Sequence, residues 1–275
     1  MHQFHHPIFV IGSGAMAEAF VRGIVGQQAV IAHNVHVLNR NHPEKLQEMA
    51  SVYGIHPASD MAGIAKSRIV VLATKPKDAE NAIKSALPYL NGQLLVSLAA
   101  GVHIEFLQTV CEGRAKIVRT MPNIPVAVLE GVTAVSFADG IQESDKKDVL
   151  FLLQQIGDVV EIPEDMMDSV TAVSGSGPGF VSYFLEAMED AAVKLGFQPA
   201  LARRLVLQTV IGTAKTLSEW SLSPRQLRER VTSPGGTTEA GLVELKAGEL
   251  AQCVMKAMEA CSAKSAEMGR SFTVK

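Results

Sequence analysis

A glycine-rich turn near the start of the chain has the residue types and spacing that bind a phosphate. Gly12-Ser13-Gly14-Ala15-Met16-Ala17 follows the apolar run 8–11 and precedes a helical stretch that extends to about Val25. The first glycine allows a tight turn, the second lets the backbone approach a pyrophosphate, and Ala17 still permits close packing of helix on strand. Between a strand and a helix, this spacing predicts a dinucleotide site, with a ligand-free turn as the alternative.

The end of the next expected strand indicates which dinucleotide would bind. Val35 to Leu38 reads as a strand and continues into Asn39-Arg40-Asn41, which contains no acidic residue. An NAD site usually has Asp or Glu here, because a carboxylate accepts a hydrogen bond from the ribose 2′-hydroxyl. A guanidinium such as that of Arg40 pairs instead with a 2′-phosphate. The sequence therefore favours NADPH, with NADH as a weaker alternative; otherwise Arg40 is a solvated surface cation.

Two further loops are rich in small residues and could approach a ligand. Ser233-Pro234-Gly235-Gly236-Thr237-Thr238 lies between two expected helices, so its backbone amides could form an anion nest at a helix N-terminus. The alternative is a plain connection in which Ser and Thr cap the helices. Ser174-Gly175-Ser176-Gly177-Pro178-Gly179 opens a long helix, where small residues permit close approach to a ligand or surface, or form a flexible hinge.

The elements that must position these loops change in character along the chain. Up to about residue 163 strands alternate with helices, which predicts parallel βαβ units in a doubly wound Rossmann-type sheet. After Pro163 no strand is evident, and an all-α domain is expected. We therefore predict a dinucleotide-binding domain over 1–163 and a helical substrate-binding and oligomerisation domain over 164–275. The expected strands are 8–11, 35–38, 68–73, 94–99, 116–119, 131–137 and 158–162, and the helices of the second part are 180–194, 199–220, 224–231 and one or two within 238–268.

Composition excludes several classes of protein. Of the 275 residues, 47% are apolar and 19% charged, which suits a folded chain with a sizeable core. The net charge of −3 makes nucleic acid a poor partner, and no apolar run approaches the roughly 18 residues of a membrane helix. Three unpatterned cysteines and the lack of a secretory leader predict a cytoplasmic protein. The histidines at 2, 5 and 6 read as a loose tail, so no metal site is expected.

Taken together, the motifs resemble the pyrroline-5-carboxylate reductase family over essentially the whole chain. The order of the segments is more specific than any one of them, and the loop at 233–238 is the most specific. The resemblance implies hydride transfer from NADPH to the imine carbon of 1-pyrroline-5-carboxylate, which gives L-proline, and assembly as a homodimer or homodecamer. The segments that carry it are 12–17, Ala73-Thr74-Lys75-Pro76, Ala99-Ala100-Gly101, Arg119-Thr120-Met121-Pro122-Asn123, 174–178 and 233–238.

The resemblance also assigns roles to particular residues. It places the cofactor along 12–17, Ala73 to Pro76 and Ala99 to Gly101, with Asn123 bordering the nicotinamide. It places the substrate carboxylate on the loop of Ser233, Gly236, Thr237 and Thr238, and gives Thr238 the catalytic hydrogen bond to the ring nitrogen. Glu164 is implied to contact the substrate region, and Asp60 occupies a place near the adenosine ribose.

Departures from the family pattern leave other functions open. Ile124 stands where the family usually has Thr, and Gly179 and Phe180 stand where it has Ala and Tyr. A diverged NADP(H)-binding paralogue with weak or altered activity would tolerate such changes. A hydroxyacid dehydrogenase of the same architecture is disfavoured, because those enzymes use a lysine early on the long helix and here none precedes Lys194.

Overall fold

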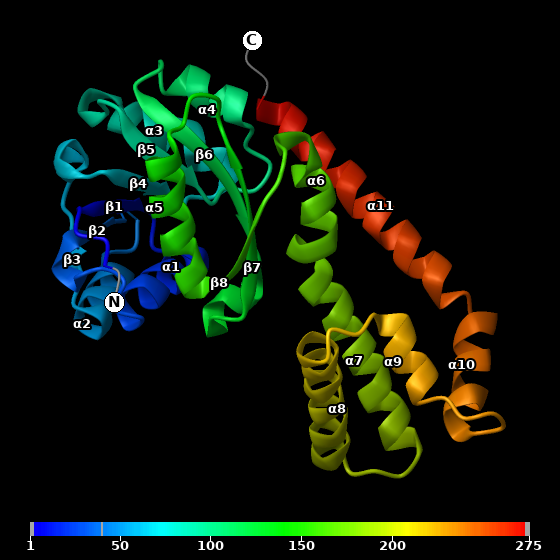
Figure 1. Cartoon of the computed structure of the whole chain (residues 1–275). Helices are drawn as coiled ribbons and strands as arrows, with labels where there is room; N and C mark the ends of the chain where they lie inside the picture. The colour runs from blue at the N-terminus through cyan, green and yellow to red at the C-terminus, as the bar shows by residue number, and fades with distance from the viewer. Residues whose placement is uncertain (1–2, 40, 273–275) are drawn as a thin grey trace. The chain divides into compact units, whose positions relative to one another are not determined.

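The computed structural model describes residues 3–39 and 41–272, which form two compact units. One unit contains the chain up to Ser176 together with the segment from Ala260 onward, and the other contains Gly177–Glu259. The first unit is an α/β domain built on a single sheet, and the second is helical (Figure 1). The predicted change from alternating strands and helices to helices alone is confirmed for the described residues, because no strand follows Glu161 there.

The sheet of the first unit has eight strands in the order β3-β2-β1-β4-β5-β6-β7-β8. Apolar residues on both faces bury the central strands: every residue of β1, β4 and β5 is buried. Helices α1, α2 and α5 pack on one face, around Phe20, Met49 and Leu152, while α3 and α4 pack on the other, around Ile83 and Leu107. The strands are β1 (Ile8–Ile11), β2 (Val35–Leu38), β3 (His56–Pro57), β4 (Ile69–Leu72), β5 (Gln93–Ser97), β6 (Ala115–Pro122), β7 (Gly131–Phe137) and β8 (Gly157–Glu161); the helices are α1 (Ala15–Gly26), α2 (Pro43–Tyr53), α3 (Ala79–Ala86), α4 (Ile104–Val110) and α5 (Glu143–Leu153).

The sheet is mixed, so the prediction of parallel units throughout is wrong at one junction. Strand β7 runs antiparallel to β6, and β8 is parallel to β7. Residues 123–130 join β6 to β7, and a parallel crossover needs a dozen residues or more. The Rossmann-type prediction is confirmed for β1 to β6, where the neighbouring strands are parallel.

The connection out of the sheet stays attached to the first unit. Helix α6 (Met167–Val170) and a π-helical turn (Thr171–Gly175) lie in this unit, as does the end of α11 (Leu250–Gly269). The hydroxyl of Ser265 donates to Asp168 Oδ1 at 2.6 Å, and Phe272 packs edge-on against Phe106. These contacts explain why the compact units divide at 176 and 259, whereas the sequence changes character near 163.

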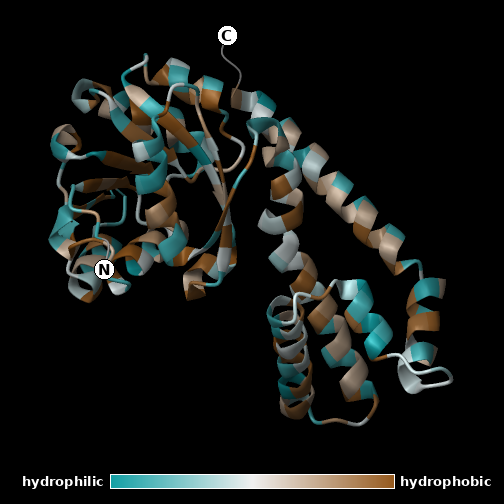
Figure 2. Ribbon diagram, viewed as in Figure 1, coloured by the Kyte–Doolittle hydropathy of each residue, from teal (hydrophilic) through white to brown (hydrophobic). Residues whose placement is uncertain are grey.

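The second unit is made of helices with few buried side chains. Only Ala202 and Val206 are buried in α7 to α10, whereas Tyr183 is 75% and Leu195 80% exposed. Figure 2 shows hydrophobic residues along α7 and α8. Its complete helices are α7 (Gly177–Lys194), α8 (Pro199–Glu219), α9 (Pro224–Arg230) and α10 (Thr237–Ala247), and the predicted stretch 238–268 is divided into α10 and α11 around Gly248. Among the described residues, no helix is long and apolar enough to cross a membrane.

Candidate functional site

A cavity of the α/β unit lies at the carboxyl ends of β1, β2 and β4. Its volume is about 880 Å³, and its walls come from the β1–α1 loop, the β2–α2 turn and the segment that follows β4. The strand order reverses between β1 and β4, and ligands of doubly wound sheets bind at such a switch point. The cavity therefore lies where the glycine motif predicts a dinucleotide.

The two glycines of the loop have different physical roles. Gly12 has φ +114°, and a Cβ there would lie 2.5 Å from the carbonyl oxygen of Ala73. A side chain at Gly12 would therefore be strained and would push β1 away from the segment after β4. A Cβ on Gly14 would have no other atom within 4 Å, so the backbone before α1 faces open space. This geometry leaves the helix N-terminus accessible to an anion.

The turn after β2 is tied to the glycine loop by the side chain of Asn39. Its Nδ2 donates to Ser13 Oγ, while its Oδ1 accepts from the backbone N–H groups of Asn41 at 2.9 Å and His42 at 3.2 Å. Ser13, Asn39, Asn41 and His42 all line the cavity. Arg40, the predicted reader of a 2′-phosphate, lies outside the described residues.

The segment after β4 brings a hydroxyl and cations to the opposite wall. Ala73, Thr74 and Lys75 line the cavity together with Lys77. The hydroxyl of Thr74 is buried and has no hydrogen-bond partner among the described residues. A buried polar atom without a partner costs free energy, so a ligand oxygen at this wall would satisfy it. The orphaned hydroxyl, the open backbone at Gly14 and the lysines together fit a phosphorylated dinucleotide.

A charge network borders the cavity where α1 meets α2. Lys45 Nζ lies 2.7 Å from Glu18 Oε2, and the Tyr53 hydroxyl donates to Glu18 Oε1 at 3.2 Å. The hydrogen bond to Glu18 raises the pKa of Lys45, so this side chain stays cationic. Desolvation, with Glu18 as the second cause, raises the pKa of Tyr53, which keeps the phenol neutral. Glu18 therefore holds both partners in place beside the cavity.

Several residues predicted to bind the cofactor do not line this cavity. Asp60 Oδ1 instead accepts from Ala62 N at 2.8 Å. Asn123 is buried and uses both side-chain atoms within the unit: Oδ1 accepts from Val132 N and Nδ2 donates to the Ser174 carbonyl. Pro76, Ala100 and Gly101 also lie outside the residues that line the cavity, as do Met16 and Ala17. Their contacts with a cofactor remain predictions.

Glu164 is held by the α/β unit through its carboxylate. Its Oε1 accepts from Ile104 N at 2.7 Å and from Arg119 Nη1 at 2.9 Å, and Arg119 is only 3% exposed. Arg119 Nη1 also lies 2.9 Å from His103 Nδ1. Glu164 therefore neutralises a buried cation and fixes the start of α4. Its contact with substrate remains a prediction.

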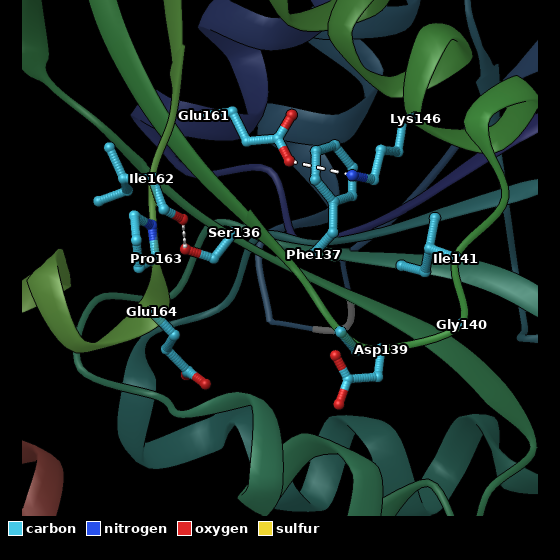
Figure 3. A pocket seen from close by; sticks show the side chains of 11 residues that line it. Ser136, Phe137, Asp139, Gly140, Ile141, Lys146, Glu161, Ile162, Pro163 and Glu164 are labelled. Carbon is cyan, nitrogen blue, oxygen red and sulfur yellow. Dashed lines mark hydrogen bonds and ion pairs between the residues drawn. The ribbon is translucent and has the colours of Figure 1, made fainter.

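A second cavity, of about 420 Å³, lies beside Glu164 at the ends of β7 and β8 (Figure 3). Lys146 and Glu161 point toward each other there, and Lys146 Nζ donates to Glu161 Oε1 at 3.1 Å. The hydroxyl of Ser136 donates to the carbonyl of Ile162. Lys146, the cation of this cavity, is thus already paired with Glu161, one of its carboxylates.

The Ser233–Thr238 loop belongs to the helical unit and is mostly exposed. Helix α10 begins at Thr237 with Gly236 as its N-cap, and Gly235 has φ +69°. The backbone N–H of Gly235 donates to Glu239 Oε2 at 2.7 Å, so the loop already binds a carboxylate of its own chain. The hydroxyls of Thr237 and Thr238 make no hydrogen bond among the described residues. The loop therefore offers free donors beside an amide that binds carboxylates.

Comparison with known proteins decides the family. Residues 164–268 match the family model "Pyrroline-5-carboxylate reductase dimerisation", and residues 7–101 match "NADP oxidoreductase coenzyme F420-dependent". Pyrroline-5-carboxylate reductase 2 of Bacillus subtilis is 36% identical over 263 residues, which are 95% of each chain. The enzyme of Synechocystis is 33% identical, over 95% of this chain and 97% of its own. The chain belongs to the pyrroline-5-carboxylate reductase family.

Solved structures of this family have the same fold. A pyrroline-5-carboxylate reductase from Coxiella burnetii superposes with a TM-score of 0.90 at 32% identity, covering 96% of this chain and 98% of that one. The Plasmodium falciparum pyrroline carboxylate reductase with NADP bound gives a TM-score of 0.86 at 31% identity, with the same coverages. The predicted family, fold class and oxidoreductase class are thereby confirmed for this pyrroline-5-carboxylate reductase family member.

The cavity of this reductase family member includes residues that the motifs did not single out. Glu18, His42, Lys45 and Lys77 all line it. Glu18 lies one turn after the glycine motif, on the helix face that follows Gly14, so helical spacing could have predicted its position. No local pattern indicated the pairing of Glu18 with Lys45, because the two residues meet only where α1 contacts α2.

Proposed function

We propose that this chain reduces 1-pyrroline-5-carboxylate to L-proline with NADPH. The observation that carries the proposal is the cavity at the strand switch point, with its open Gly14 backbone, orphaned Thr74 hydroxyl and lysines, in a chain of this family. When bound there, NADPH supplies a hydride for the imine carbon of the substrate. This reaction is the last step of proline biosynthesis.

Two walls of the cavity hold different parts of the dinucleotide. Gly12 to Ala17 hold the pyrophosphate at the N-terminus of α1, where backbone amides and the helix dipole favour negative charge. Ala73 to Pro76 follow its phosphate and ribose groups, with the Thr74 hydroxyl as a donor. Arg40, Lys75 and Lys77 favour the 2′-phosphate, so NADPH binds more tightly than NADH. Asp60, Ala100, Gly101 and Asn123 complete the site along the adenosine and nicotinamide ends.

The substrate is oriented by the loop at the start of α10. The backbone amides in the first turn of α10 bind its carboxylate, as the amide of Gly235 binds the carboxylate of Glu239. Ser233 and Thr237 add hydroxyls, and Thr238 forms the hydrogen bond to the ring nitrogen. The imine carbon is most electrophilic when that nitrogen is protonated, so the loop acts by orientation rather than by donating a proton. Glu164 is the further residue that we propose to contact the substrate.

Assembly with a second copy is supported by the helical unit. The family model that matches it is one of dimerisation, and α7 and α8 leave large apolar side chains exposed. We therefore propose a homodimer, or a homodecamer built from such dimers. Its other partner is the small-molecule substrate, and neither nucleic acid nor a membrane is proposed as a partner. The three free cysteines support a reducing, cytoplasmic compartment. Light scattering during size-exclusion chromatography measures the assembly.

The direct test mixes purified protein with 1-pyrroline-5-carboxylate and follows nicotinamide oxidation, with NADPH and NADH in parallel. Turnover with both, and a lower KM for NADPH, is the expected result. Binding of NADPH without its consumption would contradict the reductase proposal. It would favour a diverged paralogue, with Ile124, which is 60% exposed, Gly179 and Phe180 as the first positions to restore to the family residues.

A further inference from the structure

The side-chain amide of Asn39 uses its oxygen and its nitrogen for different tasks. Two backbone N–H groups, those of Asn41 and His42, point at one end of the amide. Only an oxygen can accept from both, so the NH₂ group must be the end that faces Ser13. The network itself therefore fixes the orientation of the amide, and Ser13 Oγ is an acceptor in this contact.

The acceptor role of Ser13 leaves its own hydrogen free. A hydroxyl has one hydrogen to donate and two lone pairs that accept, and Asn39 occupies one lone pair. Ser13 is only 3% exposed, yet it lines the cavity, and no described residue accepts from its hydroxyl. A buried donor in a cavity wall needs an acceptor, and oxygen atoms of a dinucleotide are acceptors.

We propose that Asn39 is a positioning residue that directs the Ser13 hydroxyl hydrogen toward an oxygen of the bound dinucleotide. At the same time it holds the backbone of residues 41 and 42 at the cavity wall. This inference rests on the proposed function, because it takes a dinucleotide as the ligand. The ligand atom is a phosphate or ribose oxygen that NADPH and NADH share, so the contact strengthens the binding of both.

An aspartate at this position would reverse the direction of the Ser13 hydrogen bond. Its carboxylate has only acceptors, so it keeps the bonds from Asn41 and His42 but takes the Ser13 hydrogen for itself. The ligand then loses its donor and meets an added negative charge. Asn39→Asp is thus a near-isosteric change. It reverses the direction of one hydrogen bond and keeps the geometry of the turn.

A double-mutant cycle between Asn39 and Ser13 tests the proposal. Dissociation constants for NADPH and for NADH are measured by titration calorimetry on wild type, N39D, S13A and the double variant. We expect S13A to weaken the binding of both cofactors about tenfold, the loss of one hydrogen bond to a charged group. N39D weakens it by at least as much, but in the S13A background N39D has a much smaller effect, because the hydroxyl is already gone.

Asn41→Asp is the matched control, since Asn41 lines the same cavity and its side chain makes no contact with Ser13 among the described residues. It adds the same charge, so its effect is equal in the wild-type and S13A backgrounds. Equal effects of N39D in both backgrounds, with melting temperatures unchanged, would overturn the proposal while leaving the cofactor site intact. Wild-type protein that binds neither cofactor would overturn the proposed function, and this inference with it.

Discussion

The dinucleotide cavity and the Ser233–Thr238 loop are built in contrasting ways. The cavity lies on a sheet whose central strands are buried, and its loops are held by contacts such as Asn39 on Ser13 and Ala73 against Gly12. The loop lies in a unit with few buried side chains, and its threonine hydroxyls make no hydrogen bond among the described residues. The first site is therefore pre-formed by its own chain, whereas the second is an exposed loop whose hydroxyl donors are unpaired among the described residues.

This contrast has a physical reason. A pyrophosphate needs several backbone amides in a fixed array, which strand ends and a helix N-terminus provide. An exposed loop on sparsely packed helices keeps its donors available to a small ligand. A change that strains the backbone of the cavity should therefore alter stability and cofactor binding together, while changes in the loop should alter catalysis alone.

The largest effect is expected from Gly12→Ala. The positive φ and the 2.5 Å approach of a Cβ to the Ala73 carbonyl predict a loss of about 2–5 kcal/mol in the free energy of unfolding, together with loss of NADPH binding. Chemical denaturation and calorimetric titration measure the two quantities. Gly14→Ala is the control: its Cβ meets nothing within 4 Å, so stability falls by less than about 1 kcal/mol while cofactor binding still weakens. Equal stability losses in the two variants would contradict this account.

Thr238→Ala tests the role of the Ser233–Thr238 loop. Loss of the hydrogen bond to the ring nitrogen is expected to lower kcat/KM about ten- to a hundredfold, since such bonds to charged groups contribute about 1.5–3 kcal/mol. Melting temperature and NADPH affinity stay at wild-type values, because the side chain is exposed in the helical unit. Thr238→Ser, which keeps the hydroxyl, restores most of the activity. An unchanged kcat/KM in Thr238→Ala would exclude this role.

Glu164→Gln tests whether Glu164 stabilises the α/β unit or contacts the substrate. The buried Arg119 loses its charged partner, so we expect the free energy of unfolding to fall by about 1–2 kcal/mol, discounted because Glu164 is partly exposed. The control is Glu161→Gln, which removes an exposed pair with Lys146 and is expected to leave stability nearly unchanged. A rise in the KM for 1-pyrroline-5-carboxylate with no loss of stability would instead favour direct contact with substrate.

The smallest expected effect is a pH dependence of stability from His36 on β2. Burial, and secondarily the neighbouring His56, lowers the pKa of His36 below its ordinary 6.5. The unfolded chain therefore takes up a proton first, and the free energy of unfolding falls as pH drops below about 6.5, by less than about 1 kcal/mol because the ring is only partly buried. His36→Phe keeps the stacking on Phe9 and should flatten this part of the curve. The measurement is the denaturation midpoint of wild type and of His36→Phe between neutral and acidic pH. If the two proteins lost stability in parallel, His36 would not be the source of the pH dependence.

Much of this architecture could be predicted from local patterns. The Gly12–Ala17 motif between an apolar strand and a helix, the missing acid after Leu38 and the lack of strands between Glu161 and the last described residue each depend on residues close in sequence. The antiparallel β6–β7 junction was missed, although the short 123–130 connection already excluded a parallel crossover. Helix α4 was also missed, because it has only seven residues and its start is fixed by Glu164.

Residue types and short-range spacing were enough to predict the order of the elements and the positions of the glycine motif and the α10 loop, and the resemblance of the ordered motifs indicated the family. Which side chains meet became clear only in the folded chain. Folding pairs Glu18 with Lys45, Asn39 with Ser13 and Glu164 with Arg119, and it leaves the Thr74 hydroxyl without a partner among the described residues of the cavity wall. Such pairings join residues that are distant along the chain, and they depend on how strands register and helices pack, which no local pattern encodes.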